Sequence, residues 1–143
     1  MIIDERKRWT IDATLAALLA LDLTLAVWAF AFPDAWFAAF HGVARVDPEG
    51  LLPRMGANWS AFALFQATAL ARWRKQPVWL AVAAGLRLSD IFTDWTYLAA
   101  CHEITWFGRA ALLAAGPANV VAGVTLLRAH AKVTTAADAG PPS

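Results

Sequence analysis

Long apolar stretches alternate with short polar connections along the whole of this 143-residue chain. A helix needs about 20 residues to cross about 30 Å of hydrocarbon, and four stretches have that length. Proline lies at positions 33, 53 and 77, close to the ends of these stretches, where a missing N–H does little harm. The pattern predicts an all-α fold, an integral membrane four-helix bundle made by one domain over residues 1–132. Its expected spans are residues 11–32, 55–73, 78–101 and 107–127.

The connection between the first two stretches, residues 33–54, is the only long one. Asp34 is a candidate N-cap, apolar residues follow it at helical spacing, and Gly42 offers an end. We therefore expect an external amphipathic helix in the membrane interface, with three aromatic residues toward lipid: Trp36, Phe37 and Phe40. Tryptophans near the ends of the expected spans are interpreted as interfacial anchors. These are Trp9, Trp73, Trp79, Trp95 and Trp106.

Basic residues are divided unevenly between the two sides of the predicted bundle. Eight lie at the termini or between the second and third stretches: Arg6, Lys7, Arg8, Arg72, Arg74, Lys75, Arg128 and Lys132. Three lie on the other side: Arg45, Arg54 and Arg109. By the positive-inside rule both termini are cytoplasmic, as expected for a protein of the bacterial inner membrane. The polar residues 133–143 predict a disordered C-terminal tail on that side.

The composition of the chain agrees with a membrane location. It is 59% hydrophobic, with a mean hydropathy of +0.49, and 16% of its residues are charged, against about 25% in soluble domains. A net charge of +1 without a basic patch argues against nucleic acid as a partner. The single cysteine, Cys101, excludes an intrachain disulfide. A cleaved signal peptide is a weaker interpretation of the N-terminus, because its apolar run is too long and contains Asp22.

The most informative residues are charged and lie inside the third apolar stretch. Arg87, Asp90 and Asp94 are spaced i, i+3 and i+7, so they share one helix face, on which Tyr97 follows. An unpaired charge at membrane depth costs about 2.5–3.5 kcal/mol on insertion scales, which favours pairing inside a bundle. We therefore predict a buried polar network that includes polar residues of the other stretches: Asp22, Gln66 and Asn119.

The charges of this predicted network do not balance. The carboxylates of Asp22, Asp90 and Asp94 face one central arginine, and we expect Asp94, which lies nearer the outer face, to pair with Arg54 or Arg109. Desolvation and like charge favour the neutral acid, so at least one of these groups is expected to carry a proton near neutral pH. A proton relay or a cation site needs that property. The alternative is a purely structural network, because interhelical hydrogen bonds in lipid contribute about 0.6–2 kcal/mol each.

Motifs for catalysis or metal binding are scarce in the chain. His41, His102 and Glu103 are all expected on the outer face and form a weak candidate metal site, with no ligand spacing that compels it. No histidine lies at mid-membrane depth, which argues against haem held between helices. The chain contains no P-loop, no dinucleotide-binding glycine motif and no GxSxG motif. The sequence therefore identifies no cofactor and no catalytic residue.

Three functional hypotheses follow. In size and hydropathy the chain resembles small bacterial four-span proteins of the DoxX-like kind, a resemblance that implies a membrane bundle and no particular activity. The leading hypothesis is an accessory or interaction subunit, or a protein that binds or relays a small polar species, with a membrane protein or a second copy as its partner. One alternative is a small membrane enzyme for a lipid or quinone-like substrate, with Asp90 or Asp94 as general base and Arg87 stabilising charge. The other is a proton-coupled small-molecule carrier that works as an oligomer.

Overall fold

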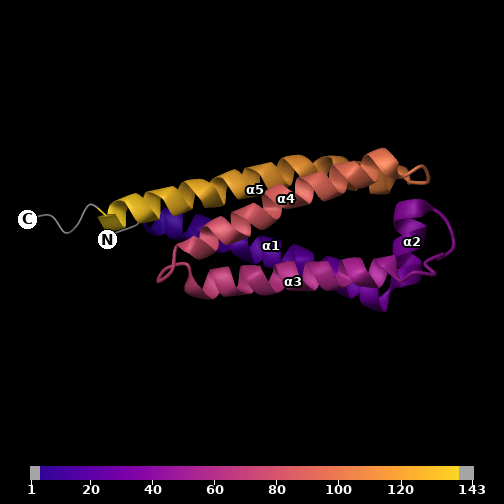
Figure 1. Ribbon diagram of the computed structural model, residues 1–143, viewed down its shortest axis with the longest axis horizontal. Coiled ribbons are helices and arrows are strands. Elements are labelled where there is room, and N and C mark those ends of the chain that lie inside the picture. The colour runs from indigo at the N-terminus through magenta and orange to yellow at the C-terminus, as the bar shows by residue number, and fades with distance from the viewer. Residues whose placement is uncertain (1–3, 139–143) are drawn as a thin grey trace, which may run out of the picture.

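The computed structural model describes residues 4–138, which form five α-helices and no strand (Figure 1). Four helices are long and one, α2, is short. Their bounds are α1 Glu5–Ala31, α2 Pro33–His41, α3 Leu51–Arg72, α4 Val78–Ala100 and α5 Trp106–Asp138. The all-α prediction is confirmed, and a separate short helix does follow the first long one.

Local sequence signals explain where α2 and α3 begin and end. Phe32, and not Asp34, occupies the N-cap position of α2, because Pro33 takes the first helical position, which suits its fixed φ. Gly42 ends α2 with φ 70°, a left-handed conformation that favours glycine. The Asp47 carboxylate then accepts hydrogen bonds from the first two backbone N–H groups of α3, at 2.7 and 3.1 Å. The connection thus caps the helices on both of its sides.

The four long helices run alternately up and down and associate as two pairs. α1 packs along α3, α4 packs along α5, and the contacts between the pairs are fewer and run mainly between α3 and α4. In Figure 1 α5 lies along the top of the bundle and α3 along the bottom, and α1 and α4 cross between them. The start of α1 and the end of α5 lie at one end of the bundle, which we call the terminal end. α2 lies across the opposite end, which we call the α2 end (Figure 1).

Apolar side chains fill the terminal end of the bundle. The buried core residues there come from all four long helices: Ile11, Leu15, Leu18, Ala69, Trp73, Leu80, Ala83, Ala84, Leu126 and Val133. Trp73 is 1% exposed, so its prediction as an interfacial anchor is wrong. Its indole N–H donates to the Asp12 carboxylate at 2.8 Å, and Asp12 also pairs with Arg74. The hydrogen bond to Asp12 satisfies the one polar atom of this ring, which allows the ring to be buried.

Small residues on α5 let it lie close to α4. A Cβ atom on Gly123 would stand 2.7 Å from Leu88, and one on Gly116 would stand 2.6 Å from the Trp95 ring nitrogen. Both distances are below those that real side chains tolerate, so the approach of the two helices depends on glycine. Trp95 thereby contacts α5 with one side of its ring while it remains 55% exposed.

Two of the five helices, α1 and α5, are both long enough and apolar enough to cross a membrane. α3 and α4 have the length and carry more polar residues, above all the charges of α4 at positions 87, 90 and 94. α5 also continues beyond the expected boundary at 127 as far as Asp138, and Val133 is buried in the core. The tail predicted as disordered from 133 is therefore helical through 138, and the remainder of that prediction, 139–143, lies outside the described residues.

Candidate functional site

Asp22 is completely buried near the middle of α1, on the helix face that also carries the buried residues Leu18 and Ala26. Its carboxylate accepts three hydrogen bonds. Arg87 donates from Nη1 to Oδ1 at 3.3 Å and from Nη2 to Oδ2 at 3.0 Å, a paired geometry that adds strength and direction. Gln66 Nε2 donates to Oδ2 at 2.7 Å. The predicted association of Asp22, Gln66 and Arg87 is therefore present in the structure.

Arg87 links this carboxylate to a second one. The guanidinium is 1% exposed, and its Nη1 lies 3.7 Å from Asp90 Oδ2, one helical turn along α4. Its carbon Cζ lies 5.2 Å from the centre of the Phe62 ring, a distance at which the ring face attracts a cation. Asn119 of α5 is buried and lies beside the Asp90 carboxyl group. Arg87 is thus shared unequally, with two short contacts to Asp22 and one long contact to Asp90.

These five residues, Asp22, Gln66, Arg87, Asp90 and Asn119, are called the charged cluster below. The α1–α3 pair supplies Asp22 and Gln66, and the α4–α5 pair supplies the other three. The cluster therefore joins the two helix pairs where direct helix contact is limited. Two of its buried atoms, Gln66 Oε1 and Arg87 Nε, make no hydrogen bond to any of residues 4–138. An unsatisfied buried polar atom costs about 1–3 kcal/mol, so the cluster has capacity for another polar partner.

Asp94 lies outside the charged cluster, one turn further toward the α2 end, and is partly exposed. The predicted pairing of Asp94 with Arg54 or Arg109 is absent: within residues 4–138 the ion pairs join Arg87 to Asp22, Arg87 to Asp90, and Arg74 to Asp12. Both outer arginines are exposed. α4 packs mainly on α5, so the half of α4 that lies nearer the α2 end is separated from the start of α3, where Arg54 lies. The Arg109 side chain is exposed on α5.

A second polar group closes the α2 end. The Tyr97 hydroxyl lies 3.0 Å from His41 Nε2, and His41 Nδ1 lies 2.9 Å from the backbone carbonyl oxygen of Glu103. A carbonyl accepts only, so Nδ1 carries the hydrogen, and in the neutral imidazole Nε2 accepts from the Tyr97 hydroxyl. Thr105 adds two bonds to the end of α2, from its backbone N–H to the carbonyl of Phe40 at 2.8 Å and from its hydroxyl to that of Ala39 at 2.6 Å.

The weak candidate metal site is not assembled. His41 faces the main chain of Glu103 and not its carboxylate, while the side chains of His102 and Glu103 are exposed. Within the described residues, no three His, Cys, Asp or Glu side chains come close enough together to hold a metal ion.

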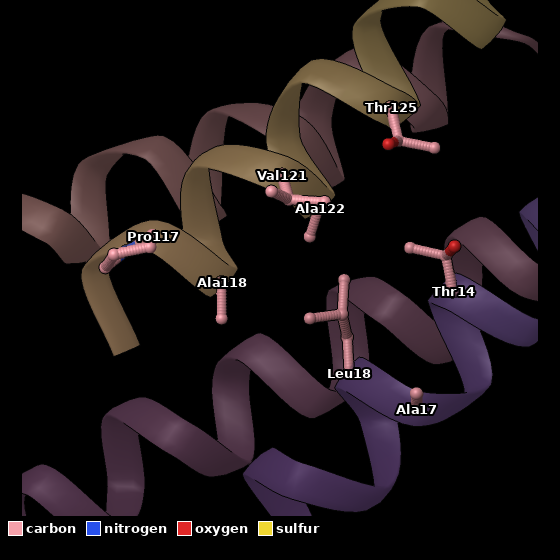
Figure 2. Close-up of a pocket in the computed structure, with 8 residues that line it drawn as sticks. All are labelled: Thr14, Ala17, Leu18, Pro117, Ala118, Val121, Ala122 and Thr125. Atoms are coloured by element: carbon pink, nitrogen blue, oxygen red, sulfur yellow. The ribbon is translucent and has the colours of Figure 1, made fainter. Parts of the chain in front are cut away.

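Sequence reasoning missed two features of the structure. The aromatic residues Trp36 and Phe40 of α2 contact Trp28 of α1, Trp59 of α3 and Phe107 of α5, at ring separations of 5.2–5.6 Å. They therefore pack on the bundle while remaining half-buried, and these contacts were not predicted from the sequence. The second is an open groove of about 490 Å³ between α1 and α5, into which Leu18 projects toward Ala118 and Ala122 (Figure 2).

No protein-family model, no curated protein and no solved structure matches this chain. Its function has therefore to be inferred from the residues described above.

Proposed function

We propose that this chain is a four-span integral membrane protein whose charged cluster binds a proton reversibly. The observation that carries the proposal is the unequal sharing of Arg87 between the buried Asp22 carboxylate and the slightly exposed Asp90 carboxylate. Ionisable residues at membrane depth are interpreted as functional by default, because a charged side chain in the hydrocarbon region costs free energy.

The distribution of residue types supports a membrane location for all four long helices. The charged cluster lies inside, while large apolar side chains lie on the outer surfaces of the two less apolar helices as well. Leu64 on α3 is 68% exposed and Phe92 on α4 is 76% exposed. With 22 and 23 residues, these helices are about 33–35 Å long, enough to cross the hydrocarbon. An apolar outside around a polar inside is the arrangement that lipid favours.

The geometry of the cluster supports proton binding at Asp90 in particular. Asp22 is held by three donors and would lose short charge-assisted bonds on becoming neutral. Asp90 has one arginine contact at 3.7 Å, and its side chain is 13% exposed, so it can gain and lose a proton with little rearrangement. Arg87 can balance one of the two carboxylates, which leaves the other to be neutralised by a proton.

A membrane enzyme for a lipid or quinone-like substrate is the second candidate, and the groove between α1 and α5 favours it. The groove is open to the side and lined by small and apolar residues, which suits a hydrocarbon chain (Figure 2). Its lining offers two threonine hydroxyls, Thr14 and Thr125, and no acid, base or nucleophile of the usual catalytic kind. We therefore rank this function below proton binding.

Infrared difference spectroscopy tests the proposal on the purified protein in lipid. Between about pH 5 and about pH 9, a carboxylic C=O band should appear at low pH and vanish at high pH, a range where an ordinary exposed aspartate stays ionised. Asp90→Asn should remove the band, whereas the exposed Asp34→Asn should leave it in place. The absence of any titrating band in the natural protein would overturn the proposal.

A further inference from the structure

Exposure rises steadily along the polar face of α4 toward the α2 end. Arg87 is 1% exposed, the Asp90 side chain is 13% exposed, Asp94 is partly exposed, and Tyr97 is 43% exposed. No residue of α4 beyond Arg87 is buried. The polar face that begins in the charged cluster therefore ends at the surface, where Tyr97 meets His41.

The other side of the cluster is closed by apolar packing. Leu80, Ala83 and Ala84 precede Arg87 on α4, and all three are completely buried. Leu15 of α1 and Leu126 of α5 belong to the same core and are also fully buried. A close-packed apolar layer of this kind gives a proton no hydrogen-bonded route.

From these two observations we infer that the charged cluster exchanges protons with one side of the membrane alone, the α2 end, by way of Asp94. A hydronium ion gives its proton to the Asp94 carboxylate and leaves as water, and Asp94 passes that proton to the Asp90 carboxylate. The two side chains are four residues apart on one helix face, where they are neighbours. The inference rests on the proposed function and makes the cluster a one-sided proton-binding site, in place of a relay that crosses the membrane.

Single-cysteine labelling tests this inference on the full chain in a Cys101→Ser background. The probe is a membrane-impermeant, cationic methanethiosulfonate, added to either side of sealed vesicles. Glu49→Cys, in the exposed connection after α2, marks the α2 side. Asp94→Cys reports the proposed route, and Ala83→Cys reports the apolar layer. Phe92→Cys is the matched control, because it lies at nearly the same depth on the exposed face of α4.

We expect Asp94→Cys to react from the side that labels Glu49→Cys, and about tenfold faster than Phe92→Cys, because a thiol in apolar surroundings forms little thiolate. Ala83→Cys should react from neither side. Tyr97→Cys, one turn nearer the surface, should give the result expected of Asp94→Cys and replaces it where that variant does not accumulate.

Reaction of the position-94 thiol from the terminal side, or from neither side, would overturn the inference. If the infrared band still titrates in that case, the proposed proton binding stands without one-sided access. Equal labelling rates at positions 92 and 94 would contradict both the proposed membrane-embedded proton-binding site and its one-sided access, because α4 would then face water all around.

Discussion

Arg87 is held by contacts from two other helices, α1 and α3, and from the next turn of its own helix, α4. Two of its nitrogens donate to Asp22 of α1, the Phe62 ring of α3 lies over its guanidinium carbon, and Asp90 lies one turn away. A guanidinium removed from water needs such partners, since its desolvation penalty amounts to several kcal/mol. The arginine and its carboxylates therefore stabilise one another as a group, and their effects on stability should not be additive.

Removal of the arginine alone should consequently do more harm than removal of the whole charged group. Arg87→Leu leaves buried carboxylates without a counter-charge and should lower the unfolding free energy by about 3–5 kcal/mol. The triple change Asp22→Leu, Arg87→Leu and Asp90→Leu removes the desolvation penalty together with the charges, so it should cost much less. Thermal unfolding in mild detergent compares the two proteins, and equal losses would argue against a mutually dependent cluster.

At the scale of the elements, close packing of α4 and α5 depends on glycine at specific positions. Gly123→Ala places a methyl group 2.7 Å from Leu88 and should destabilise the protein by about 1–3 kcal/mol, as overpacking usually does. Gly85→Ala is the matched control on α4, because a Cβ there meets no atom within 4 Å. It should stabilise the helix by up to about 1 kcal/mol. Thermal unfolding reports both changes, and equal effects at the two glycines would contradict this view of the packing.

The sequence predicted the elements better than their contacts. Hydrophobic length and the prolines located the four long helices, and Gly42 located the end of α2, because these signals act locally. Periodicity also placed Asp22, Gln66, Arg87 and Asn119 inside the bundle. It could not show that Trp73 reaches Asp12, 61 residues away, or that α2 packs its aromatic rings on α1, α3 and α5. Those contacts depend on how the helices pair, which no local pattern encodes.

At the scale of the whole molecule, the proposed four spans make a prediction about topology. The start of α1 and the end of α5 lie at the same end of the bundle, opposite α2 (Figure 1). Alkaline phosphatase fused after Lys132 should therefore be inactive, whereas a fusion near Glu49 should be active, because basic residues gather at the terminal end. Activity of both fusions would contradict an even number of spans, and the reverse pattern would invert the side from which protons reach Asp94.

The ion pair between Asp22 and Arg87 joins residues 65 positions apart, and this distance matters during synthesis. In the proposed four-span arrangement, α1 and α3 leave the ribosome first, so Asp22 enters the membrane with Gln66 as its partner and without Arg87. Arg87 follows in α4, where the arginine alone adds about 2.5–3.5 kcal/mol to the cost of membrane entry and Asp90 on the next turn is its nearest counter-charge within the helix. The closer of the two carboxylate partners of Arg87 therefore lies on the hairpin that is made first, and a chain truncated after α3 would retain Asp22 without Arg87. We expect such a truncated product to be less stable than the full chain, because its buried acid lacks the arginine that holds it.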